Sequence, residues 1–352
     1  MLTLPAATAF SDLEHSASAT PSTSAAATSP NPTTAAVAIH ANSSSGYDIK
    51  NNPRSDSSIA QLSDSEMKEM VYALYDNQRR RDALDILSKV INSRPVRTAE
   101  LAPMLWNTPG IAFILLKEAL TAYRFLNNED RLKLISGRVL NAICLLQCVA
   151  MHASCRRPFV TAHIPIYLYP FLRMKETTPT TEKLRLASLG TLGALVKMND
   201  PQVIHYLLDS QVFPCCLCSL EFGDQLAKSV AAYVMYKLLS SEFGINYCCN
   251  FSERFLSVVQ VLRKIIEQTS ELNEHTIRML RFALGSYLVL AEFPRACEYL
   301  KLYFPSKFCS AYFVTLLQKV EPRLYEDLMR LCDKIDAEMI RLRLPTLGPL
   351  RL

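Results

Sequence analysis

The sequence feature that most constrains the fold is a run without any charged residue, residues 186–196 (LASLGTLGALV). The run combines leucines and a valine with alanine, serine and glycine. A helix that is apolar on every side must be covered by other elements over most of its surface. Small residues allow those neighbours to approach the backbone closely. The run therefore predicts a helix that is buried between other helices.

Similar runs of small and apolar residues recur at residues 141–146, 229–234 and 282–287. Their spacing is on the order of 40 to 50 residues, which is typical of armadillo and HEAT repeats. In such a solenoid each unit covers its central helix with the units before and after it. We therefore predict an all-α fold, an armadillo/HEAT-like helical solenoid. From periodicity alone, an irregular all-α globule is the alternative.

The composition changes sharply along the chain. Residues 1–62 are rich in Ser, Thr and Ala, as in residues 20–29 (TPSTSAAATS), and such a segment buries too little apolar area to offset its chain entropy. We expect a disordered tail there. A targeting peptide is the alternative, although no Lys or Arg precedes Lys50. Ser63 and Glu66 have capping-box spacing and indicate that the folded body begins there. We predict a helical repeat domain over residues 63–335 and a C-terminal tail over residues 336–352.

Composition also limits the class of protein. The chain has 352 residues, of which 49% are hydrophobic, so it can bury a sizeable core. Its 11 cysteines are odd in number and unevenly spaced, unlike a secreted disulfide framework. The longest uncharged run, residues 139–155, is short and contains polar residues, which predicts a buried helix and not a membrane span. We expect a reduced, intracellular, soluble protein without membrane contact.

No pattern of residues predicts catalysis. Nucleophile elbows, phosphate-binding glycine loops and zinc-protease motifs do not occur in the sequence. Cys215 and Cys218, with Cys216 between them and Cys248 and Cys249 later, come nearest to a metal site. Zinc requires four converging ligands, whereas these cysteines stand among apolar residues, where free cysteine packs as a small hydrophobe. We expect no catalytic residue, no cofactor and no metal.

Basic residues give the formal net charge of +5, which by itself does not predict a nucleic-acid-binding protein. We interpret Arg79, Arg80 and Arg81 as a solvated helix start. A further set of basic residues is spread through the body and would bind phosphates if it lined one groove. This set consists of Arg173, Lys175, Lys183, Arg185, Arg254, Arg263, Lys264, Arg278, Arg281 and Arg295.

Several long segments resemble the Rcd1-like (Caf40) family of cell differentiation proteins, in the order in which that family carries them. They cover most of residues 66–320. The segments are residues 101–106 (LAPMLW), 141–150 (NAICLLQCVA), 162–165 (AHIP), 169–172 (YPFL), 184–190 (LRLASLG), 193–197 (GALVK), 253–255 (ERF) and 294–296 (PRA).

The resemblance implies an armadillo-like solenoid that acts as a non-catalytic subunit of the Ccr–Not complex, which shortens messenger-RNA poly(A) tails. It implies docking on the large Not scaffold subunit and recruitment of repressor proteins, some through Trp-containing peptides, for mRNA decay and translational repression. It places the protein in the cytoplasm, including P-bodies, and in the nucleus. Weak nucleic-acid binding through a basic concave groove and assembly into a homodimer are further expectations.

The resemblance also points to residues that would bind tryptophan side chains. One pocket segment of the family reads Tyr-x-Arg-Phe, and here it is Ser252, Glu253, Arg254 and Phe255. The arginine can stack on an indole ring, but a serine replaces the tyrosine.

The second pocket segment begins here with Phe293, Pro294 and Arg295, and Tyr299 stands where the family has a small residue. We expect the ring of Tyr299 to fill part of that pocket.

A third family site binds peptide helices in a groove. The family's histidine and phenylalanine after its tryptophan correspond here to Asn107 and Pro109. Phe113 and Val230 complete this set of groove candidates.

Overall fold

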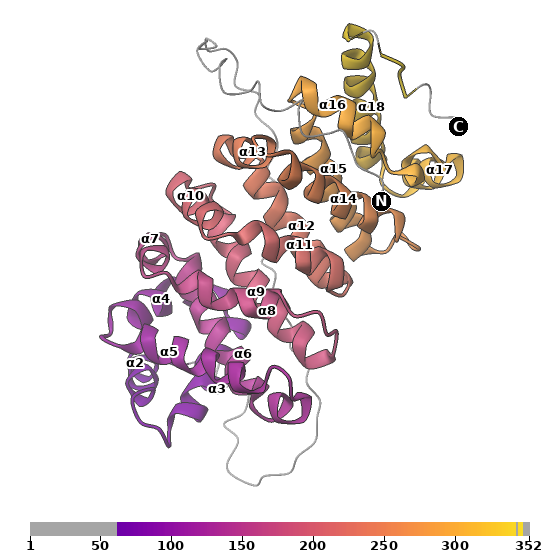
Figure 1. Cartoon of the computed structure of the whole chain (residues 1–352). Coiled ribbons are helices and arrows are strands. Elements are labelled where there is room, and N and C mark those ends of the chain that lie inside the picture. The colour runs from indigo at the N-terminus through magenta and orange to yellow at the C-terminus, as the bar shows by residue number, and fades with distance from the viewer. Residues whose placement is uncertain (1–61, 343, 348–352) are drawn as a thin grey trace.

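The computed structural model describes residues 62–342 and 344–347, which form helices and short 3₁₀ turns and contain no strand (Figure 1). The side chains of Pro95 and Arg295 are outside this description. The tail predicted for residues 1–62 lies outside the described residues except for Leu62. Within the described range, the all-α prediction is confirmed.

After α2 (Asp64–Ala73) and α3 (Arg80–Ser93), the helices follow one another as five units of three. The first helices of the units are α4 (Thr98–Asn107), α7 (Ala153–Thr161), α10 (Pro201–Asp209), α13 (Glu242–Cys249) and α16 (Pro294–Leu302). The second helices are α5 (Ile111–Leu120), α8 (Tyr169–Leu172), α11 (Val212–Phe222), α14 (Ser252–Glu267) and α17 (Ala311–Val320). The third helices are α6 (Glu129–Met151), α9 (Pro179–Val196), α12 (Gln225–Leu239), α15 (Glu274–Leu290) and α18 (Pro322–Arg341). The 3₁₀ turns are η2 (Pro95–Arg97), η3 (Thr121–Phe125), η4 (Ile164–Leu168) and η5 (Ser306–Cys309).

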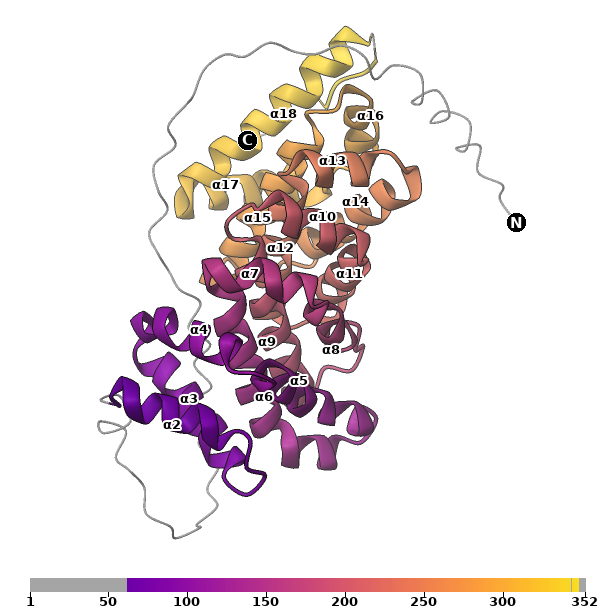
Figure 2. The ribbon, with the colours of Figure 1, turned by 90° about the vertical axis from the view of Figure 1, so that its left-hand side faces the viewer.

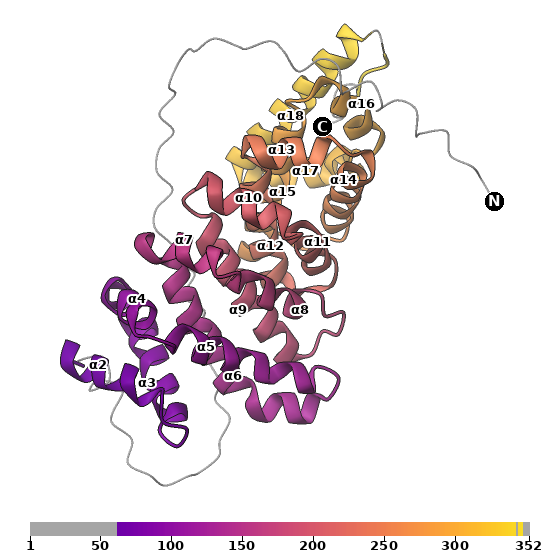
Figure 3. The ribbon, with the colours of Figure 1, turned by 60° about the vertical axis from the view of Figure 1, so that its left-hand side comes forward.

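The third helices of neighbouring units pack side by side, which makes the molecule a solenoid. The third helices form a continuous series in which α6 contacts α9, α9 contacts α12, α12 contacts α15, and α15 contacts α18. Their first residues, 129, 179, 225, 274 and 322, follow at intervals of 46 to 50 residues. Figures 2 and 3 show the same order from two other sides, with α2 and α3 at one end and α18 at the other. The predicted armadillo-like solenoid is therefore confirmed.

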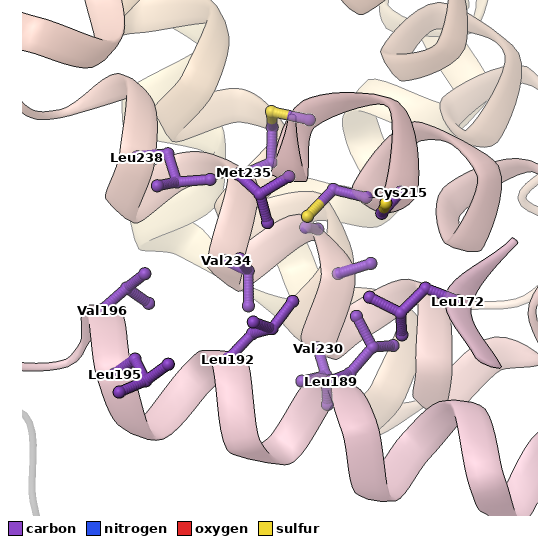
Figure 4. Close-up of a cluster of buried hydrophobic side chains, with 14 of the residues drawn as sticks. Leu172, Leu189, Leu192, Leu195, Val196, Cys215, Val230, Val234, Met235 and Leu238 are labelled. Carbon is purple, nitrogen blue, oxygen red and sulfur yellow. The ribbon is translucent and has the colours of Figure 1, made fainter. Parts of the chain in front are cut away.

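Helix α9 contains the uncharged run that predicted this architecture. Only three of its eighteen residues, Pro179, Lys183 and Gly190, are not buried. Leu189, Leu192 and Leu195 of α9 share one apolar cluster with residues of α12 (Figure 4). At about 25 cal/mol per Å² of apolar surface removed from water, this burial is the main stabilising term of the repeat.

Glycines in the third helices make room for large side chains of the neighbouring third helix. A Cβ atom at Gly193 would lie 3.6 Å from the Tyr233 ring of α12. A Cβ atom at Gly285 would lie only 2.9 Å from the Tyr236 ring, closer than ordinary van der Waals contact. The close packing of α15 on α12 therefore depends on the missing side chain at position 285.

One interpretation of the basic residues is wrong. Arg79 and Arg81 are exposed, but Arg80 is buried and does not form part of a solvated helix start. Its guanidinium donates hydrogen bonds to the carbonyl oxygens of Leu74 (2.7 Å) and Tyr75 (3.1 Å) and forms an ion pair with Glu118 (3.1 Å). The carbonyls at the end of a helix have no partner within it, and Arg80 supplies the donors just after α2.

Arg185 of α9 also donates hydrogen bonds to carbonyl oxygens at the end of a helix, and it cannot bind a phosphate. Its side chain is fully buried and donates to the carbonyl oxygens of Leu172 (3.0 Å) and Met174 (2.6 Å). It also forms an ion pair with Glu182 (3.1 Å). This arginine therefore ties the end of α8 to the start of α9.

In length and apolar composition, α6 is the one helix of the described chain that would be able to cross a membrane. Two pairs of helices that are bent at a short break would also qualify if each pair formed one span. The first pair is α4 followed by α5 and η3, and the second is α10 followed by α11. In the structure α6 packs against α3, α5 and α9 as the third helix of its unit. Its apolar surface is thus used within the solenoid.

The last helix extends beyond the domain boundary expected from the sequence. Helix α18 ends at Arg341, so the boundary at residue 335 falls inside it. Ile335 and Met339 are both buried on its inner side. The final repeat therefore continues into the segment that was expected to be a C-terminal tail.

Candidate functional site

The two tryptophan-pocket segments, distant in sequence, meet in the structure. Ser252 and Phe255 belong to the first turn of α14, and Pro294 and Tyr299 belong to α16. The Phe255 ring is buried and packs edge-on against the Tyr299 ring, with 6.2 Å between ring centroids. We call this junction of α14 and α16 the aromatic junction. The ring of Tyr299 therefore occupies the position at which the resemblance predicted a partly filled pocket.

Arg254 is held by rings of its own chain. Its guanidinium carbon lies 3.6 Å from the centre of the Tyr247 ring and 4.7 Å from that of Phe251. It also donates a hydrogen bond to the carbonyl oxygen of Tyr247 (2.6 Å). Cations stack favourably on the faces of aromatic rings. Arg254 is therefore positioned by intramolecular contacts before any ligand arrives.

Sequence reasoning missed Tyr247 and Phe251. It treated the serine at position 252 as the loss of an aromatic residue, but Phe251 directly precedes it and Tyr247 lies on α13. That Phe251 stands one position before the expected tyrosine could be seen in the sequence. The contact of Tyr247 with Arg254 could not be seen there, because it depends on how α13 packs beside α14. Arg295 belongs to α16, but its side chain lies outside the described residues.

Three of the groove candidates lie together at the junction of α4 and α5. Asn107 and Pro109 are exposed, and the side chain of Phe113 is 67% exposed. The hydroxyl of Tyr75 donates a hydrogen bond to the carbonyl oxygen of Pro109, and the Tyr75 ring stacks on that of Tyr72. We call Tyr72, Tyr75, Pro109 and Phe113 the N-terminal aromatic surface. Patches of exposed apolar groups mark interaction sites in soluble proteins, which makes these residues candidates for one.

The fourth groove candidate, Val230, lies elsewhere. It belongs to α12, is only 4% exposed and packs in the cluster between α9 and α12 (Figure 4). Because the two helices approach closely here, Val230 is part of the core and presents almost no surface to a ligand.

Several of the basic residues proposed for a phosphate-binding groove are already paired. Lys264 forms an ion pair with Glu221 (2.6 Å), and Arg281 forms one with Glu321 (3.4 Å). Lys228, which the sequence did not single out, is half-buried, and burial followed by repulsion from Lys264 lowers its pKa. Together with the burial of Arg185, these contacts reduce the positive charge available to a nucleic acid.

The cysteine cluster lies in the protein interior. Cys215 and Cys216 are buried in α11, and burial raises the pKa of both thiols, Cys216 most strongly. Cys248 and Cys249 are buried in α13. Among the described residues, no group of three or more His, Cys, Asp or Glu side chains is arranged to hold a metal ion. The α11 cysteines pack as neutral thiols.

Comparison with known proteins identifies relatives over most of the chain. The family model "Cell differentiation family, Rcd1-like" matches residues 70–335. The chain is 36% identical to cell differentiation protein rcd1 of Schizosaccharomyces pombe over 250 residues, which is 71% of this chain and 86% of the relative. It is 35% identical to Protein CAF40 of Saccharomyces cerevisiae over 260 residues, 74% of this chain and 65% of the relative.

Solved structures share the fold at low sequence identity. Crystal structures of two engineered proteins superpose with TM-scores of 0.54 and 0.55 at 13% and 12% identity. They cover 78% and 77% of this chain and 97% and 99% of their own lengths. At this identity the likeness concerns the fold alone.

Proposed function

Because the chain belongs to the Rcd1-like cell differentiation family, we propose that it acts as a non-catalytic adaptor subunit of the Ccr–Not mRNA deadenylase complex. The observation that carries this proposal is the family membership, together with a helical solenoid that exposes separate aromatic surfaces. Solenoids present extended surfaces for binding other proteins. In this role the chain recruits repressors to the complex, for mRNA decay and translational repression, in the cytoplasm, P-bodies and nucleus.

The N-terminal aromatic surface is the site we assign to the large Not scaffold subunit. Its aromatic residues come from α2, the turn that follows α2, and α5, and the Phe113 side chain is 67% exposed. Aromatic side chains are enriched among the residues that dominate the energy of protein interfaces. An apolar anchor of this kind supports a stable contact with a scaffold.

Co-purification of the full chain with a Not scaffold fragment tests the adaptor function. We expect a complex that survives size-exclusion chromatography at micromolar concentrations. If the two proteins elute separately at those concentrations, the proposed function is wrong.

We assign repressor peptides to the aromatic junction. Arg254 is already oriented by Tyr247 and Phe251, so little side-chain entropy is lost when a ligand stacks there. The Tyr299 ring beside Phe255 restricts the space, which favours weaker binding of tryptophan than the family pattern implies.

Nucleic-acid binding through a basic groove is the alternative function and has less support. Arg185 is buried, and Lys264 and Arg281 have carboxylate partners. Titration with single-stranded RNA at two salt concentrations distinguishes the two functions, since phosphate contacts give a steep dependence of affinity on salt. Under the adaptor proposal, we expect the chain to bind single-stranded RNA only weakly at physiological salt concentration.

A further inference from the structure

The chain turns back on itself after its last helix (Figure 2). The peptide N–H of Leu347 donates a hydrogen bond to the carboxylate of Asp336 (2.5 Å), which lies eleven residues earlier, on α18. The N–H of Leu344 donates to the carbonyl oxygen of Met339 (2.8 Å). Residues 344–347 (LPTL) therefore run back along α18. We call them the C-terminal strap.

The strap also contacts α16. The Lys301 ammonium, near the end of α16, donates a hydrogen bond to the carbonyl oxygen of Pro345. Since α16 and α18 pack against each other, the strap lies across their junction. Leu344 and Leu347 are half-buried and pack on the apolar core, whereas Pro345 and Thr346 between them are exposed. We call the surface of α16 and α18 that the strap contacts the strap site.

The contacts of the strap site define the kind of segment that it can bind. Asp336 accepts from a peptide N–H and Lys301 donates to a peptide carbonyl, so both polar contacts go to the backbone of the segment. Backbone contacts of this kind do not depend on sequence, and the side chains between them give the specificity. Here that specificity comes from two leucines three positions apart. The proline after the first leucine restricts the backbone before it to extended conformations, which lowers the entropy lost on binding.

The strap is held by few contacts. Its described residues make three hydrogen bonds with α16 and α18, and both of its leucines are only half-buried. A segment that is joined to its site by a short connection has an effective concentration there on the order of millimolar. Weak contacts are therefore enough to keep the strap in place, and a free segment of the same pattern can compete with it.

The two helices also expose apolar side chains beside the contacts of the strap. Leu302 follows Lys301 in the sequence and is 70% exposed, and Ile340 follows Met339 and is 67% exposed. A ligand longer than the strap can remove this surface from water as well, which favours the ligand over the strap.

We propose that the strap site is a docking site for a partner protein that carries an extended Leu-Pro-x-Leu segment, and that the C-terminal strap occupies this site in the free chain. The strap is then an intramolecular competitor. It lowers the apparent affinity for the partner by the fraction of chains in which the site is open. The proposal is independent of the adaptor function, because its test requires no subunit of the Ccr–Not complex.

Release of the strap in the full chain tests the proposal. The variant Leu344→Ser with Leu347→Ser removes both apolar anchors and keeps the chain length. The probe is a fluorescently labelled peptide of residues 342–350 (LRLPTLGPL), whose affinity is measured by anisotropy. We expect the released variant to bind this peptide about tenfold more tightly than the wild type does, because its site is open. The same peptide with serine in place of both leucines should bind to neither protein.

Matched variants in the released chain locate the binding. Asp336→Ala removes the acceptor for the peptide N–H and should lower the affinity about tenfold. Asp333→Ala makes the same change of charge at an exposed residue of the same helix and should lower the affinity less than about twofold. Circular dichroism of each variant shows that the helices persist.

Hydrogen exchange of the wild-type chain provides a second measurement that needs no strap variant. An unlabelled peptide of residues 342–350 that carries Thr346→Ala, and so differs in mass from the chain's own segment, is added in excess. We expect the amides of Leu344 and Leu347 in the chain to exchange faster, because the peptide takes over the strap site and exposes them to solvent.

The proposal fails if the peptide binds to neither protein, if it binds to both with equal affinity, or if excess peptide leaves the exchange of Leu344 and Leu347 unchanged. Each of these results would identify the strap as a permanent cover of the last repeat. Size-exclusion chromatography with light scattering tests a further occupant. A wild-type dimer that becomes monomeric in the released variant would assign the strap site to the C-terminal segment of a second copy, and the proposal would again be wrong.

Discussion

The Tyr299 ring packs edge-on against the buried Phe255 ring, with an interplanar angle of 72°, and brings together the two segments in which the family resemblance predicts tryptophan pockets. Arg254, which directly precedes Phe255 in the sequence, is stacked on the Tyr247 ring. In this chain the aromatic junction is partly filled by its own side chains.

Replacing the ring at position 299 should open the site. We expect Tyr299→Ala to raise the affinity for a Trp-containing peptide about tenfold, equivalent to about 1.4 kcal/mol. Isothermal titration calorimetry measures the change. Adding Arg254→Ala to this variant should reverse the gain, since the stacking partner is then removed; an unchanged affinity in the double variant contradicts the assignment.

The N-terminal aromatic surface can be tested with a single charge. Phe113→Asp should weaken association with the Not scaffold fragment by tenfold or more, because a carboxylate would have to lose its hydration in the interface. The matched control is Ile340→Asp, an exposed apolar residue of α18, which should bind as the wild type does. Pull-down at several scaffold concentrations gives both values. Equal loss in the two variants would show that Phe113 has no special role.

Removal of a buried arginine should destabilise the fold. Arg185→Met deletes the donors to Leu172 and Met174 and leaves Glu182 without its buried partner. We expect the free energy of unfolding to fall by about 3–5 kcal/mol. Lys183→Ala, on an exposed side of the same helix, should change it by less than about 0.5 kcal/mol. Urea denaturation of both variants provides the comparison.

Two helix-interior glycines should respond oppositely to alanine. Nothing lies within 4 Å of a Cβ atom at Gly137, so Gly137→Ala should stabilise α6 by about 0.5–1 kcal/mol. At Gly285 the new methyl group would meet the Tyr236 ring at 2.9 Å. The cost of crowding exceeds the helix-propensity gain there, and we expect a net loss of about 1 kcal/mol. Thermal unfolding distinguishes a rise in Tm from a fall, and a rise in both variants would mean that the Tyr236 ring relaxes freely.

Alkaline pH should weaken the fold through Tyr123. Burial, with a smaller contribution from Tyr167, raises the pKa of Tyr123 from 10.0 to about 12. Because the folded state holds this proton more tightly than the unfolded state, the stabilisation is complete below pH 10.0 and is lost as the pH rises through about 12.

The test is stability against pH for Tyr123→Phe. We expect this variant to be less stable at neutral pH, because it lacks the hydrogen bond to the Tyr167 carbonyl. Its stability should then decline less steeply than that of the wild type in the alkaline range. Tyr312→Phe, at a side chain that is 79% exposed, serves as the control and should follow the wild-type curve.

The architecture could be predicted because it depends on local patterns. The uncharged run in α9 required cover on every side, and Ser63 with Glu66 forms the capping box that its spacing indicated. Both features involve residues within a few positions of one another, so periodicity and capping rules were sufficient.

The details of the sites could not be predicted in the same way, because they depend on contacts between units. Arg80 looked like part of a solvated cluster, and its partner Glu118 is supplied by α5. Arg254 finds Tyr247 on a different helix, and Val230 is covered by α9. The cavity of about 500 Å³ between α12, α15 and α18 combines three helices whose relative positions no single segment encodes.

The contacts between neighbouring units have a mechanical consequence. Hydrogen bonds such as Ser219 to the Leu172 carbonyl and the Asp224 amide to Glu182 join one unit to the next. Small rotations between neighbouring units would therefore add up along the solenoid. A partner that bends one end of the solenoid would spread the deformation over all units as a gentle change of curvature. The resistance to that bending comes from the contacts between successive units.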